Sequence, residues 1–238
     1  MKRPPNFDSL AGIYRWMEIF TFGPFLRRCR FAFLDELQNR RNALVLGDGD
    51  GRFTARLLEE NQLVLIDAID ASPAMLRALL HNVGLRTGRV RVHLADIRQW
   101  QPEGPRYDLI VTHFFLDCLS TKEIVSLASK LKPCAKPGAL WVVSEFAIPP
   151  GWFGWLVARP VVSALYIVFW LMTGLTRFRL PKYQKALTEV GFTLLQKQTW
   201  LGGLLVSELW TPETLLTDSL FIRPELDPDQ PAYPPNFF

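Results

Sequence analysis

Short apolar or alternating runs and longer amphipathic stretches follow one another along the middle of the chain. The short runs predict strands at 43–46, 63–69, 89–94, 107–117, 139–145, 191–200 and 204–210. Helical periodicity is found at 52–61, from 73 onward, at 120–131 and at 183–190. The last two strands flank a double glycine at 202–203, which predicts a hairpin. Strands that alternate with helices and close in a hairpin predict an α/β fold with a mostly parallel sheet of seven strands.

The pattern also separates three additions from this core. Residues 1–38 contain two helical stretches, 8–20 and 25–37, and are expected to form an N-terminal helical lid. The main domain is expected to span 39–210, with a proline-rich loop at 132–138 and an apolar helical insertion at 146–182. Residues 211–238 are rich in proline and predict a tail.

The turn after the first strand reads Gly47-Asp-Gly-Asp-Gly51 and leads into a helix. Glycines allow a left-handed backbone and let a ligand come close to the chain. The helix N-terminus behind them offers backbone N–H groups without intrahelical partners. The dinucleotide fingerprint Gly-x-Gly-x-x-Gly requires a sixth-position glycine, and Arg52 stands there, so a nicotinamide cofactor is disfavoured.

A second motif follows the second strand and reads Asp70-Ala-Ser-Pro-Ala-Met-Leu76. Asp70 stands where an acid at the end of that strand meets a ribose diol in folds of this class. Gly-x-Gly-x-Gly followed by Asp-x-Ser-Pro-x-Met-Leu resembles the class I S-adenosylmethionine-dependent methyltransferases. The resemblance implies a Rossmann-like sheet with the strand order 3-2-1-4-5-7-6, and S-adenosylmethionine as cofactor with S-adenosylhomocysteine as product.

The resemblance also implies which residues bind the cofactor. Asp96 and Ile97, after the third strand, would meet the adenine, and Tyr14 would close over the cofactor from the leading helix. In most of the family an acid stands two residues before the first glycine, where this chain has Val45, so Asp48 is expected to supply that carboxylate. The expected cofactor-binding residues are Tyr14, Gly47, Asp48, Gly49, Gly51, Asp70, Ala71, Met75, Asp96, Ile97 and Thr112.

Methyl transfer requires alignment of donor and acceptor, and a general base helps where the acceptor is a hydroxyl. Carboxyl ends of strands are where α/β sheets bind ligands, and three titratable residues follow the fourth and fifth strands there. His113 is the first candidate for a base, with Asp117 after it, and Glu145 is a candidate acceptor contact. The reaction requires no metal, and no metal-binding motif is present in the sequence.

The insertion contains no charged residue between Pro160 and Thr176. Three interpretations stay open: a buried cap over the substrate pocket, a cap that also touches the membrane surface, and a transmembrane helix. A spanning helix needs about 20 apolar residues, and Arg159-Pro160 interrupts the apolar stretch, which counts against the third. In the family this insertion commonly forms the acceptor pocket, so its composition implies an apolar or aromatic acceptor.

Composition narrows the choice of function further. A net charge of +4 over 238 residues is too small to indicate a nucleic-acid-binding surface. Three scattered cysteines and a polar start favour a cytoplasmic protein without a secretory signal, with membrane-surface contact through 152–185 as one alternative. We therefore expect O- or C-methylation of a small apolar or aromatic acceptor. The alternative is a catalytically inactive module that binds the cofactor and docks to a partner or membrane.

Overall fold

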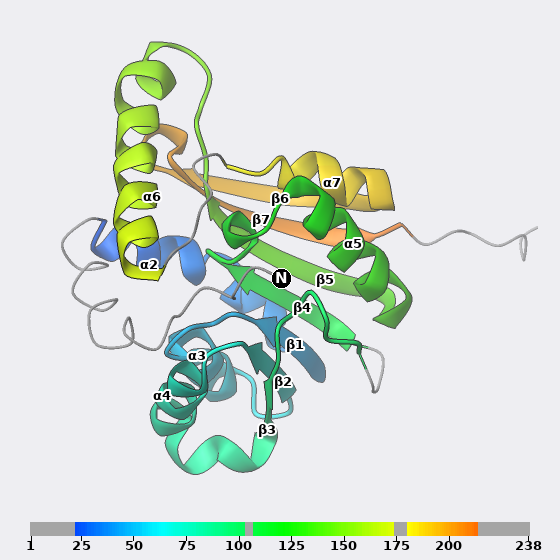
Figure 1. Ribbon diagram of the computed structural model, residues 1–238. Coiled ribbons are helices and arrows are strands. Elements are labelled where there is room, and N and C mark those ends of the chain that lie inside the picture. Colours follow the sequence, from blue (N-terminus) through cyan, green and yellow to red (C-terminus); the bar gives the residue numbers. More distant parts are fainter. Residues whose placement is uncertain (1–21, 103–106, 174–179, 214–238) are drawn as a thin grey trace, which may run out of the picture.

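The computed structural model describes residues 22–102, 107–173 and 180–213, with side chains of α6 described as far as Ile167. Seven strands form one sheet in the order β3-β2-β1-β4-β5-β7-β6 (Figure 1). β7 runs antiparallel to β5 and β6, and the other neighbouring strands are parallel. The predicted sheet and strand order are confirmed. The strands are β1 Asn42–Leu46, β2 Leu65–Asp70, β3 Val90–Leu94, β4 Tyr107–His113, β5 Ala135–Phe146, β6 Phe192–Trp200 and β7 Leu205–Pro212.

Helices cover both faces of this sheet, and alternate strand residues point to opposite faces. On one face β1 contributes Ala43 and Val45 to the core beneath α3 and α4, and on the other it contributes Leu44 and Leu46 to the core beneath α5 and α7. Val45 is buried in that first core, where an unpaired carboxylate would be costly. The helices are α2 Pro24–Arg30, α3 Arg52–Glu60, α4 Pro73–Val83, α5 Thr121–Leu131, α6 Arg159–Thr173 and α7 Tyr183–Val190.

Two predicted helix starts are held by side-chain caps. The Ser72 hydroxyl accepts a hydrogen bond from the backbone N–H of Met75 at the start of α4. Ser120 and Glu123 form a reciprocal capping box at the start of α5, as their spacing predicts. Both caps fix the direction in which the chain leaves a strand end, and so they position the loops at that edge of the sheet.

Three predicted boundaries were wrong. The helix expected at 25–37 ends at Arg30 and continues as a 3-10 turn, Leu34–Leu37, because Phe33, Leu34 and Leu37 turn into the core beneath α3. The strand expected at 107–117 ends at His113, since Phe114 adopts a left-handed backbone with φ of 52°. Part of the loop expected at 132–138 belongs to β5, where Ala135 pairs with Tyr107 before a shift of register. The expected helix at 8–20, Tyr14 and the tail from 214 lie outside the described residues.

The apolar insertion begins with a π-helical segment, Gly154–Ala158, and continues as α6. Figure 1 shows α6 standing beside the end of the sheet at which β4 and β5 finish. Its inner residues Val162 and Tyr166 pack with Ala158 and Leu204, so the insertion covers the strand ends as a cap. Within the described ranges, no helix has the length and apolar character needed to cross a membrane.

Candidate active site

The glycine turn between β1 and α3 is left-handed at each of its three glycines. A Cβ on Gly47 would stand 2.2 Å from the ring of Phe115, and one on Gly51 would stand 2.5 Å from Leu79. A Cβ on Gly49 would meet no atom of the described residues within 4 Å. Two glycines are therefore required by close neighbours, whereas Gly49 borders open space that a ligand can enter.

Asp48 turns inward from this loop and acts on the start of α3. Its Oδ2 accepts hydrogen bonds from the backbone N–H of Thr54 at 2.8 Å and the hydroxyl of Thr54 at 2.7 Å. Burial raises the pKa of Asp48 to about 6, opposed by the charge of Arg30. Oδ1 is buried and has no hydrogen-bond partner among the described residues. Asp48 therefore caps α3 with one oxygen and keeps the other available.

The predicted acids of β2 and β3 lie at the same edge of the sheet as the glycine turn. Asp70 ends β2, and its carboxylate accepts a hydrogen bond from Ser72 N–H at 2.8 Å. Asp96 follows β3 and accepts from Arg98 N–H at 2.9 Å, while the Arg98 guanidinium lies 3.1 Å from its other oxygen. Since β1, β2 and β3 are adjacent parallel strands, the structure brings these three loops together, as the sequence predicts.

The other residues expected around the cofactor differ in how far their side chains are exposed. Ala71 is exposed beside Asp70, whereas Met75 and Ile97 are buried beneath the loops. Thr112 is fully buried, and its hydroxyl accepts a hydrogen bond from the indole N–H of Trp141 at 3.0 Å. The structure therefore does not bring the Thr112 side chain to the edge where the cofactor is expected.

His113 lies at the end of β4, on the face covered by α2 and α3. His113 Nδ1 lies 2.8 Å from the Ser144 hydroxyl, which also contacts the carbonyl of Cys29 and the hydroxyl of Ser207. Nε2 is buried without a hydrogen-bond partner in the described structure. Burial, together with the charge of Arg30, lowers the pKa of His113 well below its ordinary value. His113 is thus a neutral imidazole packed at its edge against Phe53.

Glu145 lies next to Ser144 on β5 but faces the opposite side of the sheet. Its Oε1 accepts hydrogen bonds from the backbone N–H groups of Phe115 at 3.0 Å and Leu116 at 2.7 Å. Oε2 is buried and makes no hydrogen bond with any described residue. Burial and the neighbouring charge of Asp117 raise the pKa of Glu145 well above its ordinary value. Burial also raises the pKa of Asp117 to about 6.

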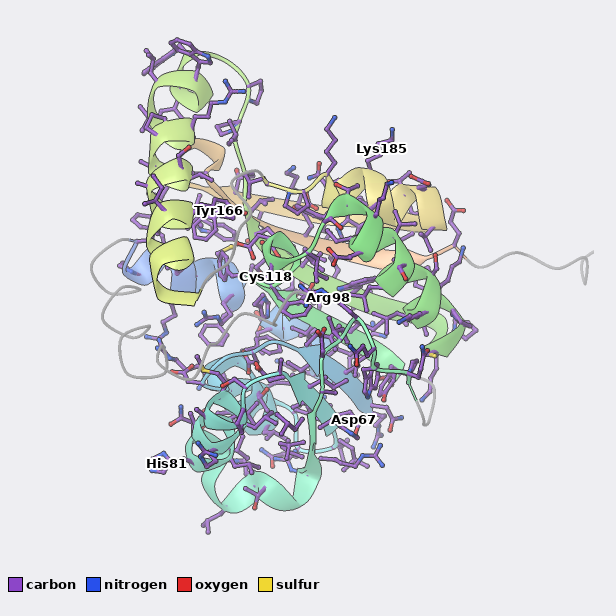
Figure 2. The ribbon with its side chains drawn as sticks, viewed as in Figure 1. Asp67, His81, Arg98, Cys118, Tyr166 and Lys185 are labelled. Carbon is purple, nitrogen blue, oxygen red and sulfur yellow. The ribbon has the colours of Figure 1, made fainter. Side chains whose placement is uncertain are left out.

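The structure adds Tyr166 to this carboxyl pair, and the sequence analysis did not single it out. Figure 2 shows Tyr166 on α6 pointing towards the region of Cys118, which follows Asp117 in the chain. Its hydroxyl is buried, has no hydrogen-bond partner in the part of the chain described, and is influenced by the charges of Asp117 and Glu145. A tyrosine in an uncharged helical stretch resembles any core residue, so its sequence carried no signal for this contact.

His113 and Glu145 are therefore not brought together, although both are predicted near the acceptor. His113 pairs in register with Ser144, and the pleat places the following residue, Glu145, on the other face. His113 belongs with Arg30 and Asp48, whereas Glu145 belongs with Asp117 and Tyr166. Arg30, buried in α2, is a second residue that the sequence analysis did not identify, because its stretch also contains the exposed Arg27 and Arg28.

Comparison with known proteins shows which family and which folds the chain resembles. Residues 44–141 match a family model described as a methyltransferase domain. A malonyl-[acyl-carrier protein] O-methyltransferase from Paenibacillus sp. (strain JDR-2) is 28% identical over 169 residues, which cover 66% of this chain and 59% of that protein.

Solved structures share the fold. The apo form of the S-adenosylmethionine-dependent methyltransferase SibL has a TM-score of 0.61 at 19% identity, over 89% of this chain and 63% of that chain. An O-methyltransferase family protein from Burkholderia thailandensis has a TM-score of 0.63 at 15% identity, over 85% of this chain and 59% of that chain. The N-methyltransferase NodS from Bradyrhizobium japonicum WM9, in complex with S-adenosylhomocysteine, has a TM-score of 0.58 at 16% identity. The match covers 79% of this chain and 88% of that chain.

The chain spans 59% of the length of the Paenibacillus protein and 63% of SibL. The matched region contains the glycine turn, both acids at the strand ends and β4, which are the parts that position the candidate site. The two sequence motifs, the strand order and the matched domain agree: the chain contains a methyltransferase domain at residues 44–141 and is similar to the class I S-adenosylmethionine-dependent methyltransferases.

Proposed function

We propose that the protein transfers a methyl group from S-adenosylmethionine to oxygen or carbon of a small apolar or aromatic acceptor. The observation that carries the proposal is the open space at Gly49, in a turn at the same edge of the sheet as the loops that present Asp70 and Asp96. An extended ligand with a ribose and an adenine fits this row of loops, since carboxylates accept hydrogen bonds from hydroxyl and amino groups. Bound there, S-adenosylmethionine supplies a sulfonium-activated methyl group.

Within this proposal the chain binds the cofactor, orients the acceptor and excludes water from the site. Asp70 holds the ribose, Asp96 with Ile97 holds the adenine, and Asp48 offers its remaining carboxylate oxygen to the amino group of the cofactor. α6 covers the ends of β4 and β5 and surrounds the acceptor with the apolar side chains of Val162, Leu204 and Phe146. Alignment of donor and acceptor inside such a cover is the main contribution to rate that a methyltransferase requires.

Calorimetric titration of the purified protein with S-adenosylmethionine, S-adenosylhomocysteine and NADH tests the cofactor. Micromolar binding of the first two and none of the third is expected. Folded protein that binds neither methyl donor nor product would overturn the proposal. Binding without methyl transfer to any acceptor in a panel of phenols and lipids would instead favour an inactive cofactor-binding module.

A specific surface favours the further proposal that this protein is cytoplasmic and touches the membrane peripherally. Trp152, Trp155 and Leu156 at the start of the insertion are 72%, 67% and 58% exposed, which is unusual for a group of large apolar residues. Arg159 is exposed beside them, and a basic residue next to exposed tryptophans suits the interface of an anionic bilayer. The same helix turns its other side towards the sheet, so membrane contact leaves the cap in place.

Cosedimentation with phosphatidylglycerol and phosphatidylcholine vesicles tests this surface. The wild type is expected to sediment with the anionic vesicles, and the double variant Trp152→Ser/Trp155→Ser is expected to stay in solution. Leu195→Ser is the matched control, because Leu195 is also exposed but lies on β6. Equal sedimentation of all three proteins would overturn the membrane proposal.

A further inference from the structure

Two buried polar atoms, one near the end of β5 and one in the middle of α6, lack partners although both side chains are almost fully enclosed. Glu145 is 1% exposed and Tyr166 is 3% exposed, and neither Glu145 Oε2 nor the Tyr166 hydroxyl has a hydrogen-bond partner among the described residues. A buried polar atom without a partner destabilises the folded protein. Two such atoms on neighbouring elements indicate that a ligand group completes their hydrogen bonding.

The surrounding contacts fix Glu145 in one orientation. Phe115 and Leu116 donate to Oε1, whereas Oε2 has no partner among the described residues and can bond to a ligand. The same Phe115 lies against Gly47, which places the turn that holds Glu145 beside the glycine turn. The carboxylate therefore lies next to the expected cofactor position, where an acceptor atom must come to meet the methyl group.

From this geometry we propose that Glu145, Asp117 and Tyr166 form a subsite that holds a hydroxyl group of the acceptor and takes up its proton. This inference rests on the proposed methyl transfer and specifies it as O-methylation of a small apolar molecule with a hydroxyl, such as a phenol. Tyr166 donates to the hydroxyl oxygen, and the carboxyl pair accepts the hydroxyl proton. Val162 and Leu204, which pack with Tyr166, provide apolar walls.

The reaction at this subsite balances without another reactant. The hydroxyl oxygen forms a bond to the methyl carbon as the bond between that carbon and sulfur breaks. The bonding electron pair stays on sulfur, which converts the sulfonium into the thioether of S-adenosylhomocysteine. The hydroxyl proton passes to the Asp117–Glu145 pair, and a carboxylate in this role typically contributes a factor of about 10²–10⁴.

The charge state of the pair gives the subsite a pH dependence. Burial raises the pKa of Asp117 to about 6 and raises the pKa of Glu145 well above its ordinary value, so the pair keeps one negative charge only above about pH 6. Below that pH both carboxyls are protonated and neither accepts a proton, so hydroxyl binding and turnover fall as the pH is lowered. The described titratable or charged groups that act on the cluster are Cys118 beside Asp117, Cys29 on α2, Tyr166 on α6, Tyr183 on α7 and, through Cys118, Arg98.

Titration of the protein–S-adenosylhomocysteine complex with 4-nitrophenol and 4-nitrotoluene tests the subsite, because only the first probe has a hydroxyl. The wild type is expected to prefer 4-nitrophenol by at least about tenfold, the equivalent of one charge-assisted hydrogen bond. Tyr166→Phe and Glu145→Gln are expected to reduce the preference to about twofold or less. The preference of the wild type should also fall at pH values below 6, and Asp117→Asn should abolish that fall.

Glu208→Gln is the control for the loss of a buried carboxylate, since Glu208 is fully buried on β7 and its partners are Lys197, Trp210 and Gln184. It should retain the wild-type preference. Tyr166→Phe removes an unpartnered hydroxyl and should leave the melting temperature unchanged or raised, whereas a purely structural Tyr166 would give a lower one. The subsite would be overturned by an unchanged preference in Tyr166→Phe and Glu145→Gln, or by no preference in the wild type. In either case, S-adenosylhomocysteine binding would still support the proposed methyltransferase function. Loss of S-adenosylhomocysteine binding in the wild type would overturn the proposed function itself.

Discussion

The two halves of the ligand-binding edge are built in different ways. At the ends of β1, β2 and β3, the polar groups lie in short loops and bond to neighbours two to six residues away, as Asp70 does with Ser72 and Asp48 with Thr54. At the ends of β4 and β5, the polar groups are buried and come from segments far apart in the sequence, as His113, Ser144 and Cys29 show. The first half is a set of local motifs, and the second half exists only after the fold has formed.

This difference has a physical basis in the two ligands. A cofactor that is common to the family can be met by backbone turns and capping carboxylates, which need only a short sequence to form. An acceptor that varies between proteins is met by whatever side chains the insertion places over the strand ends. The half proposed to bind the cofactor is therefore the half that the sequence reveals.

The largest effect is expected at Gly49, where a change breaks the cofactor half alone. Gly49→Val places a side chain in the open space and forces a branched residue to φ of 61°, so binding of S-adenosylhomocysteine should fall at least about 100-fold. Calorimetry measures the affinity, and circular dichroism checks that the protein is folded. Retained affinity in a folded variant would show that the cofactor does not lie over this turn.

A smaller loss is expected for Asp70→Ala, which removes the acid that would hold the ribose. Charge-assisted hydrogen bonds of this kind contribute about 1–3 kcal/mol, so the affinity for S-adenosylhomocysteine should fall between about fivefold and 150-fold. The 4-nitrophenol preference of the remaining complex should not change, because the acceptor half is untouched. A change of preference without a change of cofactor affinity would contradict the division between the two halves.

The smallest effect on catalysis is expected for His113→Ala, which compares the two candidate bases of the acceptor half, His113 and the carboxyl pair. The change leaves the Ser144 hydroxyl without one partner and a cavity beside Phe53, so the free energy of unfolding should fall by about 1–3 kcal/mol. Turnover should stay within about tenfold of the wild type, since the hydroxyl proton passes to the carboxyl pair on the opposite face. Denaturant titration and release of S-adenosylhomocysteine measure the two quantities. A fall in turnover of 10²-fold or more would restore His113 as the base.

Most of the fold followed from the sequence because its signals are local. The capping box at Ser120, the cap at Ser72 and the three glycines each act over a few residues, and each is found where the sequence predicts it. The end of β4 was misplaced for the opposite reason. Phe114 has no sequence feature that favours a left-handed backbone, and Glu145, 31 residues further along, holds the turn that follows it.

The candidate site was predicted only as far as individual strand ends. Sequence order placed His113 and Glu145 near the acceptor, but the one-residue offset across β4 and β5 decides that they face opposite sides of the sheet. The charge of Glu145 acts on Tyr166 only because of how α6 packs, and no spacing within the chain encodes that packing. Arg30 escaped notice for the same reason, because only the docking of α2 buries it beside His113 and Asp48.

Phe115 belongs to both halves at once. Its ring presses on the glycine turn at Gly47, and its backbone N–H holds Glu145. A cofactor that displaces this ring would also move the carboxylate, so occupancy of one half would alter the affinity of the other. Thermodynamic linkage makes that influence equal in both directions, and the acceptor would then strengthen or weaken cofactor binding by the same factor. A single phenylalanine thus gives the protein a means of coupling the binding of the two ligands.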